Sequence, residues 1–95
     1  MQQEDFLIQG LMKAEEQIAR AENDFEVESF RERYINIIDL ICYKYNKKKI
    51  DKDFVELCLK SIIKEAVELD DYKEFVNKEY TPNLIKFYDN KIKKQ

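Results

Sequence analysis

Three carboxylates stand at helical spacing in the second half of the chain, and they are the donor type that a divalent metal ion prefers. Glu65, Glu68 and Asp71 follow one another at intervals of three residues, so a helix would bring them to one face. Magnesium takes oxygen ligands that converge from more than one direction, normally from two helices. No second carboxylate motif faces this one, and Lys60 and Lys64 can pair with the acids at helical spacing. We therefore expect a solvated helix face without metal or cofactor, and a metal-dependent hydrolase is the last of three functional hypotheses.

The composition of the 95-residue chain excludes most other kinds of catalytic site. The chain has no histidine, so it lacks Ser-His-Asp and Cys-His arrangements and every zinc site that needs imidazole. Its single glycine leaves no glycine-rich phosphate loop and no dinucleotide fingerprint. Cys42 and Cys58 both lie among apolar residues, where thiols usually pack as small hydrophobic groups. We expect a protein that is not an enzyme, with two inert cysteines that would pair on oxidation only if the fold brought them together.

A lysine-rich segment with tyrosines indicates a different chemistry, the binding of phosphate groups. The segment contains Tyr43, Lys44, Lys47, Lys48, Lys49 and Lys52, and the C-terminal end adds Lys86, Lys91, Lys93 and Lys94. Lysines neutralise phosphates and tyrosines stack on bases, which makes a nucleic-acid-binding regulatory module the alternative function. Lysines also suit a helix C-terminus or an exposed loop, and a sequence pI near 5.1 is not typical of nucleic-acid-binding domains.

An acidic cluster lies in the first third of the chain. Its members are Glu15, Glu16, Glu22, Asp24, Glu26 and Glu28. Such a negative patch would meet a basic surface on a partner protein. Acidic side chains are also favoured in the first turn of a helix, where the dipole is positive, and that explanation covers the last three. We predict the six residues as the partner-binding site, with the dipole as the competing explanation.

The charges are unevenly divided between the two halves of the chain. Residues 1–43 carry ten acidic and four basic side chains, a net charge of −6. Residues 44–95 carry ten acidic and thirteen basic ones, a net charge of +3. The whole-chain value of −3 hides this division. We expect a polarised surface that orients the protein toward a partner or a second copy of itself.

The elements that position these side chains are helices, and the first is marked by a regular apolar stripe. Apolar residues from Leu7 to Phe25 recur at alternating intervals of four and three residues. This period predicts a helix over residues 4–22. Gly10 lies inside it and should cost about 1 kcal/mol of helix stability relative to alanine.

A second apolar stripe begins after the first loses phase, and it is wider. It predicts a helix over residues 24–46 that is the most buried element. Two capping boxes compete for its start, Asn23–Glu26 and Ser29–Glu32. One bent helix running through residue 25 is the alternative.

A third helix is predicted over residues 53–69, with Asp53–Glu56 as the capping box at its start. Its predicted core stripe contains Phe54, Leu57, Cys58, Ser61, Ile62, Glu65 or Ala66, and Leu69, with Val55, Leu59, Ile63 and Val67 beside that stripe. The apolar period continues to Tyr80, so this helix either extends to residue 80 or is broken at residues 70–71.

The last helix is predicted over residues 82–93. Thr81 is a competent N-cap, and Pro82 would occupy the first helical position, where proline is favoured. The fold class is therefore all-α. We expect one domain over residues 1–95, an antiparallel bundle of four main helices, or five if the third is broken.

The aromatic residues exceed what so small a bundle can readily bury, although most are predicted to lie in the core. They include Phe6, Phe25, Phe30, Tyr34, Phe54, Tyr72, Phe75, Tyr80, Phe87 and Tyr88. Uncovered apolar surface marks a homodimer or a partner interface. The leading hypothesis is therefore a small non-enzymatic module that binds a partner protein surface, as phage-type inhibitors, antitoxins and immunity proteins do. No apolar run is long enough for a bilayer and no signal peptide is visible, so we expect a soluble cytoplasmic protein.

Overall fold

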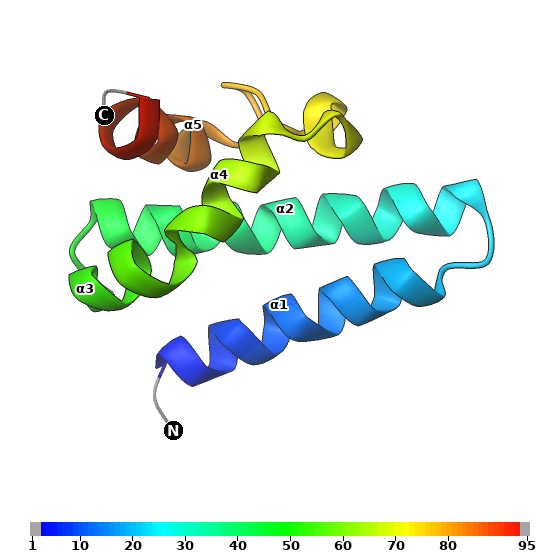
Figure 1. Ribbon diagram of the computed structural model, residues 1–95, viewed down its shortest axis with the longest axis horizontal. Coiled ribbons are helices and arrows are strands. Elements are labelled where there is room, and N and C mark those ends of the chain that lie inside the picture. The colour runs from blue at the N-terminus through cyan, green and yellow to red at the C-terminus, as the bar shows by residue number, and fades with distance from the viewer. Residues whose placement is uncertain (1–2, 94–95) are drawn as a thin grey trace.

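The computed structural model of the protein describes residues 3–93, in which every regular element is a helix (Figure 1). The elements in chain order are α1 (Gln3–Arg20), α2 (Asp24–Asn46), α3 (Lys52–Phe54), the π-helical turn η1 (Val55–Leu59), α4 (Lys60–Glu68), the 3₁₀ helix η2 (Asp70–Phe75), α5 (Pro82–Phe87) and the π-helical turn η3 (Tyr88–Lys93). This confirms the predicted all-α bundle. Lys94, predicted as part of the basic C-terminal end, lies outside the described residues.

Helix α2 is the central element of the bundle. Helix α1 runs antiparallel along one side of it, α5 packs on another, and α4 crosses it obliquely (Figure 1). Its buried residues are Tyr34, Ile35, Ile38, Ile41 and Cys42. The predicted bounds of this helix and its deep burial are therefore confirmed. None of the described helices is both long and apolar enough to cross a membrane.

The turn between α1 and α2 is closed by the first of the two predicted capping boxes. The Asn23 side-chain oxygen accepts a hydrogen bond from the backbone N–H of Glu26 at 2.9 Å, and the Glu26 carboxylate accepts one from the N–H of Glu22 at 3.1 Å. These bonds satisfy N–H groups that a helix start leaves unpaired. The alternative of one bent helix is therefore wrong, and α1 ends at Arg20, two residues earlier than predicted.

The third helical run begins one residue earlier than predicted and has a different cap. Asp51 accepts a hydrogen bond from the N–H of Phe54 at 2.9 Å, whereas the sequence favoured a box starting at Asp53. The run then continues as α3, η1 and α4 without a break until Glu68. The extra residue in the π turn changes which side chains reach the core.

The side chains that this run buries differ in part from those predicted. Ala66 is buried, as one of the two residues predicted at that place in the stripe, but Val55, Leu59 and Ile63 are also buried. Leu57 and Cys58 are exposed. This segment has two neighbouring apolar stripes, and the helical period alone does not show which of them faces the core. The π turn widens the helix locally, so residues four apart stay in line, and Val55, Leu59 and Ile63 join the common core.

The helix does not extend to residue 80, because the chain turns extended at Leu69 (φ −77°, ψ 133°). The predicted break at residues 70–71 is thus confirmed, with η2 following it. The Asn77 side-chain oxygen then accepts hydrogen bonds from the N–H groups of Glu79 and Tyr80 at 2.9 and 2.8 Å. This local turn stops any helical stripe from reaching Tyr80.

Helix α5 begins at Pro82 as predicted, but its cap comes from a different helix. The Thr81 hydroxyl is bonded to the backbone of Asn77, with both contacts at 3.0 Å. The free N–H of Leu84 instead donates to the Asp39 carboxylate of α2 at 2.8 Å. A carboxylate at the positive end of a helix is favourable for its dipole as well, so this bond holds α5 against α2.

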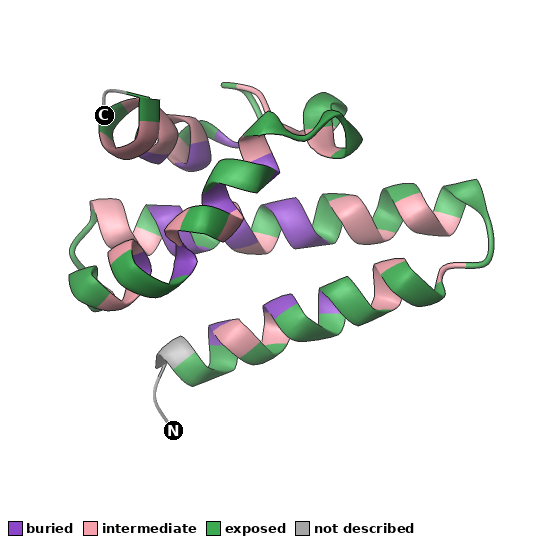
Figure 2. Cartoon of the chain, in the orientation of Figure 1, coloured by how far each residue is buried: buried purple, intermediate pink, exposed green. Residues whose placement is uncertain are grey.

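The aromatic residues divide between core and surface, and Figure 2 colours each described residue by its burial. Among the described residues, eight large apolar or aromatic side chains are exposed. Tyr34 and Phe87 are buried, and Phe30, Phe54, Tyr72, Phe75 and Tyr88 are half-buried. The exposed set is Phe6, Met12, Phe25, Leu40, Tyr43, Leu57, Leu69 and Tyr80. The prediction of uncovered apolar surface is confirmed, whereas the core positions predicted for Phe6, Phe25 and Tyr80 are wrong.

Candidate functional site

The two predicted charged groups lie at opposite ends of α2. The acidic residues gather around the α1–α2 turn, and the lysines gather around the connection of residues 47–51 at the far end (Figure 1). The 23 residues of α2 separate them by about 34 Å at 1.5 Å per residue. We call these the acidic end (Glu15, Glu16, Glu22, Asp24, Glu26 and Glu28) and the basic end (Lys44, Lys47, Lys48, Lys49, Lys52, Lys86, Lys91 and Lys93).

Three of the six residues of the acidic end make contacts with other residues of the protein. Glu26 belongs to the α2 cap, and Glu16 pairs with Arg20 at 3.0 Å. Glu15 lies beside the Tyr34 hydroxyl, where burial first and this carboxylate second raise the pKa of Tyr34. These three carboxylates therefore have structural roles on α1 and α2.

The other half of the acidic end lies close in sequence to an aromatic residue that the apolar pattern placed in the core. Glu22, Asp24 and Glu28 are exposed, and Phe25 between them is 79% exposed. The adjoining hollow between α1 and α2 has a volume of about 320 Å³, and Glu26 and Phe30 are among the residues that line it. Phe25 stands where the first apolar stripe loses phase, which is the one signal in the sequence for its exposure.

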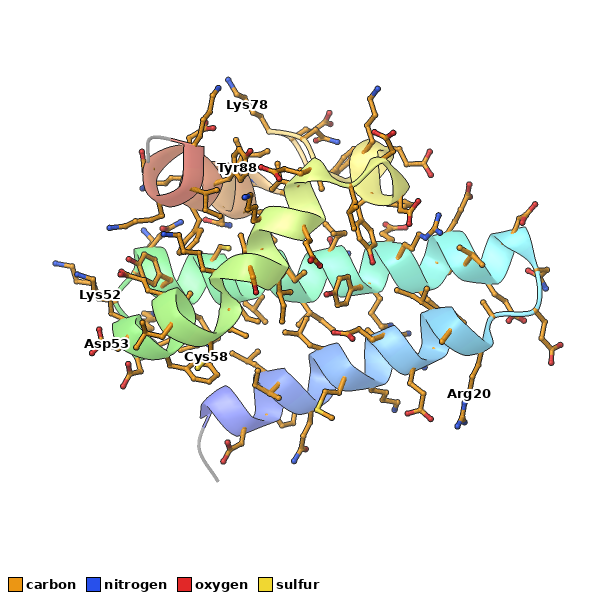
Figure 3. All side chains as sticks on the ribbon, in the orientation of Figure 1. Arg20, Lys52, Asp53, Cys58, Lys78 and Tyr88 are labelled. Atoms are coloured by element: carbon orange, nitrogen blue, oxygen red, sulfur yellow. The ribbon has the colours of Figure 1, made fainter. Side chains whose placement is uncertain are left out.

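The basic end contains a pocket that joins the two lysine groups. It has a volume of about 580 Å³ and is lined by Tyr45, Asn46, Lys48, Ile50, Lys52, Lys86 and Lys91, which we call the lysine pocket. Figure 3 labels Lys52, which projects outward at this end of the molecule. Of the residues predicted for phosphate binding, only Lys48, Lys52, Lys86 and Lys91 line it. Tyr43, Lys44, Lys47, Lys49 and Lys93 lie elsewhere at this end.

Tyr45 is fixed in the wall of the lysine pocket by contacts on both sides. Its hydroxyl donates a hydrogen bond to the Glu56 carboxylate, and its ring meets Phe87 edge-on with centroids 4.9 Å apart. Burial, followed by the contact with Glu56, raises the pKa of Tyr45 to about 12. The Lys91 ammonium lies 5.9 Å from the ring centroid, within reach of a cation–π interaction.

Glu65, Glu68 and Asp71, the carboxylates of the metal-site hypothesis, do not form a metal-binding group in the described part of the chain. Glu68 accepts a hydrogen bond from the Tyr88 hydroxyl at 2.7 Å. This hydrogen bond is the largest of the effects that raise the pKa of Tyr88. Asp71 follows the break at Leu69 and lies 3.8 Å from Arg31. In the described part of the chain, no three Asp, Glu, Cys or His side chains form a group that could hold a metal ion. The hypothesis of a metal-dependent hydrolase thus has no geometric support at Glu65, Glu68 and Asp71.

The two cysteines are free and differ in their surroundings. Cys42 is buried in α2, where burial raises the pKa of its thiol. Cys58 lies on the exposed side of η1 (Figure 3). The packing role predicted for both is therefore confirmed for Cys42 and wrong for Cys58.

Comparison of the chain with models of protein families, with curated proteins and with solved structures gives no match in any of the three.

Proposed function

We propose that the protein is a small non-enzymatic interaction module of the inhibitor, antitoxin or immunity type, which binds a partner protein through its acidic end. The observation that carries this proposal is the exposure of Phe25. A rigid aromatic side chain outside the core loses apolar contact for no structural gain, and aromatic residues dominate the binding energy of protein interfaces. Phe25 lies in the first turn of a capped helix, so little conformational entropy is lost when it binds.

The chemistry of the partner follows from the residues around Phe25. Glu22, Asp24 and Glu28 are exposed and lie within three residues of Phe25 along the chain, and these carboxylates would speed and orient association with a positively charged surface. The partner surface that fits is an apolar pocket bordered by lysine or arginine side chains. Exposed carboxylates at the rim contribute chiefly to association rate and specificity, whereas the ring supplies affinity.

The experiment is partner capture by cross-linking in the native host, with the wild type and three variants compared. Phe25→Ser and the triple variant Glu22→Gln, Asp24→Asn, Glu28→Gln should lose the partner. Tyr80→Ser is the matched control, because Tyr80 is also strongly exposed but belongs to a different surface. Circular dichroism checks that all variants are folded.

Two results would contradict the proposal. One is a partner that the wild type and Phe25→Ser capture equally well. The other is no captured protein together with a monomeric wild type in sedimentation. A wild-type dimer that becomes monomeric on Phe25→Ser would identify the partner as a second copy of the chain.

Nucleic-acid binding is the second proposal, and the convergence of the two lysine groups at the basic end favours it. Phosphate contacts by these lysines would release counterions, so affinity should fall steeply with salt. The test is titration of single- and double-stranded oligonucleotides at several salt concentrations. Absence of binding at low salt would dismiss it.

A further inference from the structure

We propose that the lysine pocket at the basic end binds a compact polyphosphate anion. The pocket volume of about 580 Å³ lies within the range of small-molecule sites, roughly 300–1,000 Å³. This site is separate from the acidic end, so the proposal does not depend on the protein-binding function.

The first argument is the convergence of four cations from four separate segments. Lys48 comes from the connection after α2, Lys52 from α3, Lys86 from α5 and Lys91 from η3. Among the residues that the structure describes, no carboxylate lines this pocket. Glu56 is a counter-charge at this end, and its pKa is lowered first by the Tyr45 hydrogen bond and then by lysines that include Lys52 and Lys91. The lining itself thus carries four ammonium groups, a positive charge that a multivalent anion would neutralise.

The second argument is the backbone of Lys48, which is the one described non-glycine residue with positive φ, at 59°. It occupies the left-handed position of a helix C-cap, with Lys48 N–H bonded to Tyr45 at 3.0 Å and Lys49 N–H bonded to Lys44 at 2.8 Å. Glycine is the usual residue at this position because a side chain is unfavourable there. Lys48 adopts this unfavourable backbone conformation, and its side chain lines the pocket.

The third argument is that the pocket walls are held in place before any ligand arrives. The Asn46 amide donates to the backbone carbonyl of Asn83 at 3.5 Å, which ties the end of α2 to the start of α5. The ring contact of Tyr45 with Phe87 and its bond to Glu56 hold a second residue of the lining in place. A pocket whose walls are already held loses less entropy on binding than one that must first be assembled.

The shape of the pocket favours a compact anion over a nucleic-acid strand. Strand binding uses a groove that tracks the backbone and aromatic rings that are open for stacking. Tyr45, the aromatic side chain in the lining, is already engaged with Phe87 and Lys91. Tyr43 is partly exposed but does not line the pocket.

The test is calorimetric titration of the full chain with inorganic tripolyphosphate at low ionic strength. We expect saturable binding that the double variant Lys86→Gln, Lys91→Gln weakens about tenfold or more, because each charge-assisted contact contributes strongly. The matched control, Lys73→Gln, Lys78→Gln, changes the net charge equally at exposed positions outside the pocket and should leave the affinity nearly unchanged. Adenosine triphosphate, as a second arm, distinguishes a nucleotide from inorganic polyphosphate as the source of the phosphates.

Lys48→Gly separates loss of binding from loss of folding. It removes one cation and also relieves the positive-φ position, so it should weaken tripolyphosphate binding while the urea midpoint of unfolding does not fall. The proposal is overturned if the wild type does not bind tripolyphosphate, or if both double variants weaken binding equally. It is also overturned if a single-stranded oligothymidine binds and tripolyphosphate does not.

Discussion

At the scale of single residues, side chains at the basic end hold the fold together and also line the lysine pocket. Tyr45 lines the lysine pocket, but its hydroxyl is bonded to Glu56 and its ring packs on Phe87. Lys48 terminates a helix and also contributes a charge to the pocket. A substitution at either position therefore changes stability and surface chemistry together, and the two effects need separate measurements.

The pKa of Tyr45 predicts how its contribution to stability depends on pH. The folded pKa is about 12 and that of an unfolded tyrosine is about 10. Between these values the unfolded chain loses the proton and the folded chain keeps it, so the free energy of unfolding falls as pH rises. We expect Tyr45→Phe to be less stable than the wild type at neutral pH, and the difference to shrink between pH 10 and pH 12. Urea unfolding at a series of pH values measures it, and a constant difference across that window would refute the prediction.

At the scale of elements, the spacing of apolar residues predicts well where the helices lie. It predicts less well which side chains of a helix face the core. The stripe of α2 lies over a long uninterrupted run, and its bounds match the structure at both ends. The run from α3 to α4 contains two apolar stripes, and the π turn that selects between them has no signature in the sequence. The fold class was thus predictable, whereas the exposure of Leu57 was not.

The candidate site shows the same division between local and distant information. The acidic and lysine-rich segments are visible in the sequence because their members are close neighbours along the chain. The lysine pocket additionally needs Lys86 and Lys91 to lie beside Lys48, and this depends on where α5 docks. That docking uses the carboxylate of Asp39, about forty-five residues earlier in the chain, as the cap of α5. A local sequence pattern identifies only caps that come from neighbouring residues, so it does not predict this one.

Asp39 should therefore be important for the stability of the bundle. Its carboxylate accepts from the Leu84 N–H at 2.8 Å and from the Asn83 amide at 3.2 Å. Asp39→Ala should lower the free energy of unfolding by about 1–3 kcal/mol, since it removes a cap and leaves donors without partners. Asn36→Ala, an exposed position on the same helix, should change it by less than about 0.5 kcal/mol. Equal stability of the two variants in urea unfolding would show that α5 does not need this cap.

Gly10 tests how tightly α1 packs on α2. A β-carbon added there would lie 3.7 Å from the Ile37 terminal methyl, an ordinary contact distance. Gly10→Ala should therefore stabilise the protein by about 0.5–1 kcal/mol through lower backbone entropy in the unfolded chain. Thermal unfolding would then shift upward by a few degrees, roughly 4–8 °C per kcal/mol for a domain of this size. A lower midpoint would mean that the helices need the glycine for close approach.

At the scale of the whole molecule, the separation of charge matters more than the net value. The molecule measures 37 Å along its longest axis, and the two charged ends lie at opposite ends of the long central helix (Figure 1). The Debye length is about 10 Å at 0.1 M salt. Each end therefore presents its own charge to a partner, largely screened from the other end. Under the two proposals, a basic protein surface and an anion would bind at separate ends of one small bundle.

Ion-exchange chromatography tests this separation directly. A net charge of −3 at pH 7 predicts retention on an anion exchanger alone. We expect the wild type to be retained on a cation exchanger as well. The salt must be low enough for the lysines to be attracted to the resin, yet high enough that the Debye length is shorter than the molecule. The triple variant Lys48→Gly, Lys86→Gln, Lys91→Gln should lose that retention.

The matched control is Lys13→Gln, Lys73→Gln, Lys78→Gln, which lowers the net charge by the same three units but leaves the lysine pocket intact. If net charge governed the interaction, both triple variants would elute alike. If the basic end acts as a unit, the control stays on the cation exchanger and the pocket variant does not. Equal elution of the two would therefore mean that the lysines of this end act no differently from scattered surface charges.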